Sequence, residues 1–428
     1  MQIVLSPLVH LGTSRLAGPV RVDIRSKEKP LMRPLSDEHQ SGQSESSALQ
    51  FAAPARVNLI GEHTDYTGGF VMPMAIPFST VAHLRPATDG KYTFSSERFS
   101  TARSMTPDDR SSRAKDWSDY PVGVLREFQQ RGLQIPPFAL HLTGDVPLGA
   151  GLSSSASVEV ATAIALLSHA QATLPAATIA KLCQSAENNY VGSPCGIMDQ
   201  FVVTAATAEH ALLLNTRDLT FELLPMNKGD LAGCTIVVAN SGVKHSIAGG
   251  DYGLRRREVE AGQTRLRERF PDLRDLADAT LEQLEACEHE LSPESFRRCR
   301  HIITENHRVR EAREAMLAGD PRRLGAVMTA AHASERDDFE CSIDEIDFLV
   351  DTAVGFRGCY GARLTGGGFG GCTVNLVNTA NVDEFIAALR SAYRSKFSLE
   401  LETYRCAAVD GALARSAAEL KGNVPEAR

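Results

Sequence analysis

The chain has 428 residues, of which 43% are hydrophobic and 23% charged, and its formal net charge is −8. This composition is typical of a globular protein, and the length suffices for about two or three domains. No apolar run approaches the ~18 residues that cross a bilayer, and the acidic balance indicates neither a nucleic acid nor a membrane as partner. Nine cysteines without C-x-x-C spacing, and no secretory leader, predict reduced thiols in the cytoplasm.

The first 48 residues predict a flexible N-terminal arm. Residues 26–48 are polar and rich in serine, with few large apolar side chains to bury. A globular pattern begins near Leu49. Strand-like alternation then recurs at five places: Arg56–Ile60, Ala211–Leu214, Phe221–Leu224, Thr235–Ala239 and Cys372–Val377. Helical spacing of apolar residues recurs at three: Ala156–Leu167, Ile343–Ala353 and Val382–Tyr393.

The best interior boundary lies at Pro225–Gly233, where turn-forming residues separate two strand patterns. We therefore predict an α+β fold of two domains, at residues 49–228 and 229–428. A binding site is expected in the cleft between them, where small-molecule sites are common.

The first polar cluster follows a predicted strand at Arg56–Tyr66. Glu62, His63 and Asp65 place several hydrogen-bonding groups within four residues. Such a set suits a polyhydroxylated ligand, because a sugar ring presents many hydroxyls at fixed angles. Turn-forming acids on a solvated loop are an equally good interpretation of this segment alone.

A loop rich in glycine and serine, Pro147–Ala156, leads directly into a predicted helix. Glycines let backbone amides approach a bulky anion, and the free N–H groups of a helix N-terminus attract phosphate. A single capping serine is the alternative, but three consecutive serines after Gly-Ala-Gly favour phosphate binding. No Gly-Lys-Ser/Thr follows, so this is not a Walker loop.

One carboxylate, Asp199, stands among apolar neighbours in Gly192–Phe201. It is either a helix cap or an acid held for chemistry, and the sequence favours neither. Glu187, twelve residues earlier, could face the same cleft as a metal ligand, although an exposed helical acid is the commoner case. The stretch Gly366–Gly371 formally fits G-x-G-x-x-G, but a strand pattern follows it, so it indicates a turn between strands rather than a dinucleotide site.

Taken together, these segments resemble galactokinases, within the larger superfamily of kinases that also act on homoserine, mevalonate and phosphomevalonate. The resemblance covers about residues 50–415. It rests on four blocks in the family's order: RVNLIGEHTDY (56–66), PLGAGLSSSASVEVA (147–161), CGIMDQF (195–201) and GARLTGGGFGGCTVNLV (361–377). The GEHTDY block is specific to the galactose branch. A two-domain fold of the superfamily type is therefore implied.

The resemblance also implies roles for these residues. Asp199 matches the catalytic aspartate that accepts the proton of the anomeric hydroxyl, and Arg56 matches the arginine that supports it. The sugar-binding positions are Glu62, His63, Thr64, Asp65, Gly196 and Tyr252. The ATP-phosphate loop is Gly149, Ala150, Gly151, Leu152, Ser153, Ser154 and Ser155, and the Mg²⁺ ligands are Ser155 and Glu187.

The implied activity is transfer of the γ-phosphate of ATP to the anomeric hydroxyl of galactose, with Mg²⁺ bound to the ATP. We expect a cytoplasmic monomer without nucleic-acid or membrane partners. Two alternatives stay open: a sibling kinase for N-acetylgalactosamine or arabinose, and a galactose sensor without turnover. Such sensors can lose residues of the serine loop, whereas Ser154, Ser155 and Asp199 are all present here.

Overall fold

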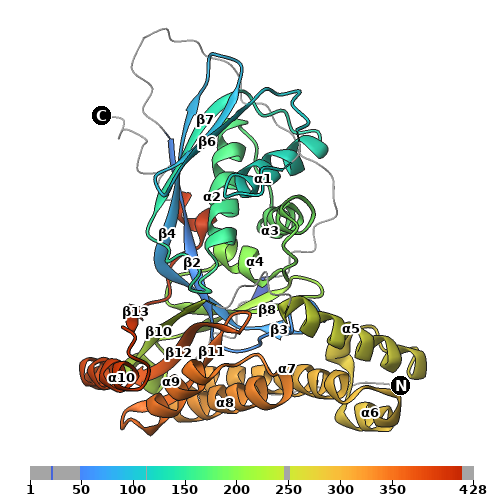
Figure 1. The fold of residues 1–428 in the computed structure, drawn as a ribbon, viewed down its shortest axis with the longest axis vertical. Coiled ribbons are helices and arrows are strands. Elements are labelled where there is room, and N and C mark those ends of the chain that lie inside the picture. Colours follow the sequence, from blue (N-terminus) through green and yellow to red (C-terminus); the bar gives the residue numbers. More distant parts are fainter. Residues whose placement is uncertain (1–20, 23–48, 112, 245–250, 417–428) are drawn as a thin grey trace, which may run out of the picture.

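The computed structural model describes residues 21–22, 49–111, 113–244 and 251–416. The molecule has two bodies stacked along its long axis (Figure 1). One body carries a tall sheet with helices α1 to α4 on one side. The other carries a shorter sheet and helices α5 to α10. The predicted α+β architecture is confirmed.

The first body is built on a five-stranded sheet of mixed direction. In spatial order its strands are β2 (Leu49–Asn58), β4 (Pro73–Pro86), β7 (Phe138–Gly144), β5 (Tyr92–Ser96) and β6 (Phe99–Met105). Its helices are α1 (Asp119–Gln130), α2 (Ser154–His169), α3 (Ala176–Ser185) and α4 (Met198–Ala205), with a π-helical turn at Ala186–Val191.

Helix α2 is the central helix of this body, since it packs on β2 and β4 and also contacts the other helices. Its apolar side chains Val160, Ile164 and Leu167 are buried in a core that also holds Phe94 and Phe138 of the sheet. Burial of each such side chain stabilises the folded state by about 1.5–3 kcal/mol. Helix α2 is therefore firmly packed, and its N-terminus is held in a fixed position.

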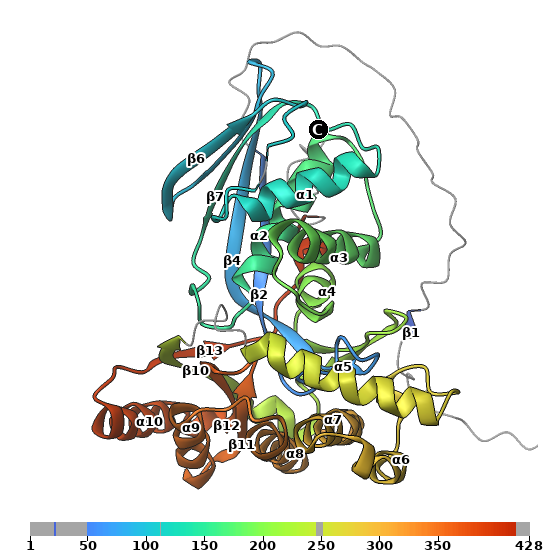
Figure 2. The ribbon, with the colours of Figure 1, turned by 45° about the vertical axis from the view of Figure 1, so that its right-hand side comes forward.

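The second body holds a sheet of four antiparallel strands and six helices. The strands are β11 (Cys359–Thr365), β12 (Gly370–Asn378), β10 (Cys234–Lys244) and β13 (Glu402–Cys406). The helices are α5 (Asp251–Arg269), α6 (Leu281–Ala286), α7 (Pro293–Ala318), α8 (Pro321–Ser334), α9 (Asp344–Gly355) and α10 (Val382–Phe397). Figure 2 shows α5 across the junction, with its N-terminal end towards the first body.

A small sheet joins the two bodies, in the order β1 (Arg21–Val22), β9 (Phe221–Pro225), β8 (His210–Asn215) and β3 (Phe70–Val71). One apolar core spans the junction: Val57 and Met74 of the first body meet Ile236, Met316 and Val374 of the second. The bodies are therefore held by a shared core.

The predicted elements are present, with longer bounds. Each predicted strand after Arg56–Ile60 lies inside an observed one, and the three predicted helices correspond to α2, α9 and α10. The first strand differs, because β2 starts at Leu49 and ends at Asn58.

The predicted boundary at Pro225–Gly233 falls between β9 and β10. The division at residue 228 stays a prediction. Ala412, which belongs to the predicted second domain by sequence, is buried in the core of the first body. Most of the predicted arm lies outside the described residues, but Arg21–Val22 pair with β9 as a strand. None of the helices in the described ranges has the length and apolar character needed to cross a membrane.

Candidate active site

A cavity of about 490 Å³ opens between the two bodies. This size is ordinary for a small-molecule site. Its walls come from the segments that the sequence singled out. The predicted site residues that line it are Arg56, Glu62, His63, Asp65, Gly149, Gly151, Leu152, Ser153, Ser154, Ser155, Glu187, Gly196, Asp199 and Tyr252.

Asp199 lies in the first turn of α4 and is held by two neighbours. Arg56 donates from Nε to Oδ1 at 2.7 Å and from Nη2 to Oδ2 at 2.6 Å, and the Ser153 hydroxyl also donates to Oδ2. Arg56 comes from β2, 143 residues away in the chain, and it lies against Asp199 at the place that the resemblance implied. The Asp199 side chain makes no capping bond, so the helix-cap alternative is wrong.

The glycine–serine loop comes close to this carboxylate. Arg56, which holds Asp199, also donates from Nη1 to the carbonyl of Gly151 at 2.6 Å. Ser153 stands at the N-cap of α2 with φ of +61°, and neither it nor another side chain caps the helix. The first N–H groups of α2 are therefore left without a capping side chain beside the cavity, which suits an anion. A left-handed serine costs of the order of 1 kcal/mol, and such strain is typical of functional sites.

The sugar-binding prediction centres on Asp65 and His63. Asp65 accepts a hydrogen bond from the backbone of Met198, and burial together with the nearby Asp199 raises the pKa of Asp65 to about 6. A Cβ at Gly196 would lie 1.7 Å from the Asp65 carboxylate, so only glycine leaves room for it there. Tyr252 also lines the cavity, and its ring centroid is 5.6 Å from that of His63.

His63 is stacked on Phe339, with ring centroids 4.0 Å apart. Its Nε2 is buried and has no hydrogen-bond partner among the described residues. Burial, with smaller contributions from His301 and Arg363, lowers the pKa of His63 well below its usual range. His63 thus lines the cavity as a neutral imidazole with one nitrogen that has no partner among the described residues, and such a nitrogen can form a hydrogen bond with a hydroxyl.

Glu62 lies at the edge of the cavity with its oxygens already engaged. It accepts hydrogen bonds from Asn58, Arg363 and the backbone N–H of Gly366. Two other predicted residues do not line the cavity. The Thr64 hydroxyl donates to the carbonyls of Gly61 and Phe70, so it supports the turn instead, and Ala150 is buried in the shared core.

On the phosphate side, Glu187 lies in the π-helical turn after α3, next to Glu159 of α2. Burial and the nearby Asp199 raise the pKa of Glu187 to about 7, and burial and Glu187 raise that of Glu159 well above its usual range. The Ser155 hydroxyl is within hydrogen-bonding reach of the Glu187 carboxylate. Among the described residues neither glutamate forms an ion pair with a protein cation.

The glycine-rich stretch Gly366–Gly371 lies at the turn between β11 and β12, as its sequence predicts, and it also forms a wall of the cavity. Gly366, Gly368, Gly370 and Gly371 all have positive φ. The turn packs against Cys341, whose carbonyl would lie 2.5 Å from a Cβ at Gly368.

Three family descriptions match the chain. "GHMP kinases N terminal domain" matches residues 119–207, "GHMP kinases C terminal" matches residues 312–395, and "Galactokinase galactose-binding signature" matches residues 38–86. A galactokinase of Roseiflexus sp. (strain RS-1) is 41% identical over 362 residues, which cover 84% of this chain and 91% of that protein. A galactokinase of Streptomyces coelicolor is 43% identical, covering 80% and 88%.

The chain belongs to the galactokinase family. Among solved structures, Lactococcus lactis galactokinase complexed with galactose has a TM-score of 0.82 at 32% identity, covering 86% of this chain and 95% of that one. A mevalonate kinase has a TM-score of 0.60 at 18% identity, which supports the fold alone. Membership of the galactokinase family thus confirms the resemblance and the fold of the GHMP kinases.

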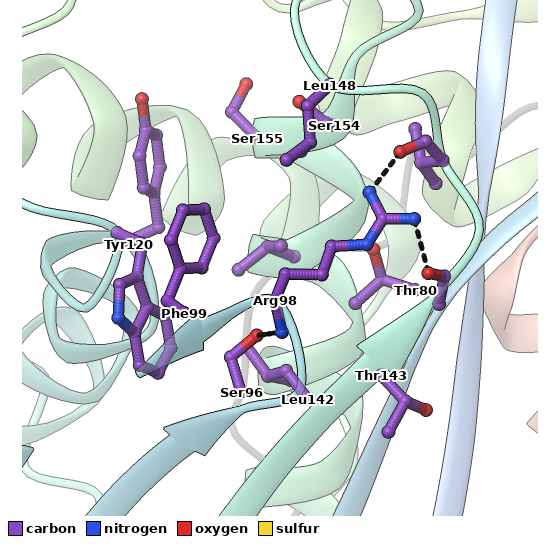
Figure 3. Close-up of a pocket in the computed structure, with 14 residues that line it drawn as sticks. Thr80, Ser96, Arg98, Phe99, Tyr120, Leu142, Thr143, Leu148, Ser154 and Ser155 are labelled. Atoms are coloured by element: carbon purple, nitrogen blue, oxygen red, sulfur yellow. Dashed lines mark hydrogen bonds between the residues drawn. The ribbon is translucent and has the colours of Figure 1, made fainter. Parts of the chain in front are cut away.

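A second cavity, which the motifs did not predict, adjoins the serine loop of this galactokinase-family chain (Figure 3). It measures about 140 Å³ and has mostly apolar walls, including Leu142, Leu148 and Val158. The rings of Phe99 and Trp117 are stacked beside it, 5.8 Å apart and 7° from parallel. Ser154 and Ser155 line both cavities, so the two open onto the same loop.

Arg98 fixes the edge of this second cavity. Its guanidinium donates to the carbonyls of Gly144 and Val146, just before the serine loop (Figure 3). No local pattern marks these three residues. Arg98 follows β5, Phe99 begins β6 and Trp117 precedes α1, all far in sequence from the loop that they support. Trp117 is the single tryptophan of the chain, which is the one signal the sequence offered.

Proposed function

We propose that this chain is a galactokinase that transfers the γ-phosphoryl group of ATP to the anomeric C1 hydroxyl of D-galactose. The observation that carries the proposal is the junction of three parts in one cavity. Asp199 and its Arg56 partner, the serine loop, and the pair Asp65 and His63 all face the same space. Galactose 1-phosphate and ADP would be the products, at the entry to galactose catabolism.

Phosphoryl transfer demands alignment and charge neutralisation more than covalent chemistry. In our proposal the Asp199 carboxylate accepts the proton of the C1 hydroxyl as that oxygen attacks the γ-phosphorus. Arg56 holds both Asp199 oxygens, so the base is oriented before the sugar arrives. Asp65 and the free Nε2 of His63 bind other hydroxyls of the ring and thereby fix which hydroxyl faces Asp199.

ATP would lie along the loop between the two cavities. The N–H groups at the start of α2 and the hydroxyls of Ser154 and Ser155 would bind its phosphates. The apolar cavity beside Phe99 and Trp117 would take the adenine ring, since a flat aromatic base suits an apolar slot of this kind.

The residues present also fit a magnesium ion. Ser155 and Glu187 supply hard oxygen atoms next to the phosphate loop, and Mg²⁺ prefers one or two carboxylates together with substrate phosphates and water. The described residues contain no group of three or more potential metal ligands. In this proposal the protein supplies only two ligands, and the phosphates and water supply the others. When bound, Mg²⁺ would neutralise charge on the transferring phosphoryl group. The monomeric state, the cytoplasmic location and the domain limits 49–228 and 229–428 stay predictions.

The test is to identify the product. Incubated with ATP and galactose, the full chain should release ADP and form one new phosphate ester. In ³¹P NMR that phosphorus should couple to the anomeric proton of the sugar. Coupling to any other ring proton would overturn the proposal.

A coupled assay of ADP release distinguishes a galactokinase from the sibling kinases and from the sensor. The kcat/KM for galactose should be at least about tenfold higher than that for N-acetylgalactosamine or arabinose. A substrate group that is missing or too large weakens transition-state binding by about 1–3 kcal/mol. Galactose binding without ADP release would indicate a sensor and contradict our proposal.

A further inference from the structure

A buried polar cluster behind the serine loop joins the proposed cation ligand Glu187 to two residues, Glu159 and Gln200, that have no role in the mechanism above. It consists of Glu159, Glu187 and Gln200, whose side chains come from α2, the π-helical turn and α4. Glu159 and Gln200 are completely buried, and Glu187 is 6% exposed. Glu159 lies four residues after Ser155 and so on the same face of α2. The cluster therefore lies next to the proposed cation site at Ser155 and Glu187.

Gln200 connects the two glutamates. Its Nε2 donates to Oε2 of Glu187 at 2.8 Å and to Oε2 of Glu159 at 3.1 Å, which uses both of its hydrogens. The Cys195 thiol approaches the same Glu187 oxygen at 3.6 Å. One oxygen of Glu187 is thus held from behind, and the carboxylate is turned towards Ser155.

The cluster is costly for stability, which argues that it serves function. Oε1 of Gln200 is buried without a partner in the described part of the chain, and the Glu159 carboxyl is buried within hydrogen-bonding reach of a second acid, Glu187. Each unpartnered buried acceptor costs about 1–3 kcal/mol. No arginine or lysine compensates the two carboxylates there. An apolar trio of the same size would pack α2 against α4 without this cost.

We propose that Gln200 and Glu159 are positioning residues that hold Glu187 in the orientation in which it binds the divalent cation. Protein groups behind a metal ligand fix its rotamer and raise its affinity for the ion. Gln200 directly follows Asp199 in α4, so one helical turn carries both the proton acceptor and the group that orients the cation ligand. This inference rests on the proposed function.

The test measures cation binding rather than turnover. Free Mn²⁺ is titrated by electron paramagnetic resonance into the full chain with saturating ADP. Gln200→Met and Glu159→Leu should each weaken Mn²⁺ binding by about ten- to a hundredfold, as is usual for such supporting groups. Glu159→Gln should restore binding to within about threefold of the unmodified chain, because its amide can still hydrogen-bond to Glu187. Galactose binding, measured by calorimetry, should not change.

Thr162→Val is the matched control. Thr162 is buried on the same helix, and its hydroxyl has no partner among the described residues, so this change should leave Mn²⁺ affinity as it is. If Gln200→Met does not fold, Gln200→Asn and Glu159→Asp are used, since each withdraws the side chain by one methylene.

The outcomes are separable. Equal Mn²⁺ affinity in the chain with and without the Gln200 change would overturn the positioning role while leaving the proposed function intact. Absence of any ADP-dependent Mn²⁺ binding in the unmodified chain would instead contradict the proposed cation site itself.

Discussion

The cleft has a buried acidic cluster on each side, and the two are built differently. On the sugar side, Arg363 lies among three buried glutamates: its Nη1 is 2.6 Å from Glu62, and its Nη2 is 2.6 Å from Glu335 and 3.9 Å from Glu305. On the phosphate side, Glu159 and Glu187 have an amide between them and form no ion pair in the described ranges. The sugar side thus carries cations of the protein's own, Arg363 and also Arg308, whose Nε is 2.6 Å from Glu305. The phosphate side has no such pair in the described ranges and would take its positive charge from a bound cation.

The Arg363 cluster also explains how the second body supports the sugar site. Its members come from the loop after β2, from α7, from the turn after α8 and from β11, which are far apart in the sequence. Glu62 is held by Arg363 and in turn accepts from Gly366 in the glycine-rich turn. The loop that carries His63 and Asp65 is therefore fixed before any ligand binds, which lowers the entropic cost of binding a sugar.

Asp199 lies between the two clusters, and its removal should have the largest effect. Asp199→Asn should lower kcat by about 10²–10⁴-fold, the usual contribution of a general base. Nucleotide binding, followed by the fluorescence of Trp117 in the second cavity, should remain near normal. Turnover within threefold of the unmodified chain would show that another group accepts the proton.

Removing the arginine should unbalance the sugar side. Arg363→Met leaves three buried glutamates with one cation fewer, and we expect a loss of about 3–5 kcal/mol in the free energy of unfolding. Arg405→Met is the control, because its ion pair with Asp383 is more than half exposed and should be worth less than about 1 kcal/mol. Urea unfolding measures both. An equal loss of unfolding free energy in the two variants would contradict the role of Arg363 in compensating the buried glutamates.

Asp65→Ala should separate the two substrates. A hydrogen bond to a charged group is worth about 1.5–3 kcal/mol, so the KM for galactose should rise by about ten- to a hundredfold. The KM for ATP should change little, because Asp65 lines the sugar side of the cavity. Steady-state kinetics with each substrate varied in turn decides this. Parallel rises in both values would exclude a sugar-specific role.

The smallest effect concerns pH. The pKa of Asp65 is about 6 in the folded chain against about 3.9 when unfolded, so between these values the folded state binds more protons. The free energy of unfolding should therefore fall as pH rises from 4 to 6. The fall should reach at most about 3 kcal/mol, and less where solvent reaches this carboxylate. Asp65→Asn should remove that part of the slope in denaturation curves at pH 4, 5, 6 and 7. An unchanged slope would contradict the raised pKa.

Much of the phosphate side could be predicted from the sequence, because its information is local. Pro147–Ala156 contains the loop, the free helix start and the serines, and the apolar periodicity of α2 follows at once. The GEHTDY segment likewise places His63 and Asp65 within three residues of each other. Local patterns of this kind also identified the turn between β11 and β12.

The rest depends on contacts between distant segments. Only the resemblance to galactokinases paired Arg56 with Asp199, because no local pattern connects two residues that are 143 positions apart. Sequence reasoning counted Thr64 with the sugar ligands, although the hydroxyl bonds two backbone carbonyls, since an exposed and a buried threonine look alike in a motif. It missed Arg363, Glu159 and Gln200, whose importance comes only from what surrounds them after folding.

The most direct test of the account is the rate of ADP release with galactose compared with its C4 epimer, glucose, at equal concentrations. A cavity that fixes the ring hydroxyls through Asp65 and His63 should favour galactose by at least about 100-fold in kcat/KM, because an unsatisfied buried polar group penalises the wrong epimer. Equal efficiency with both sugars, or ADP release that ignores the sugar, would contradict it.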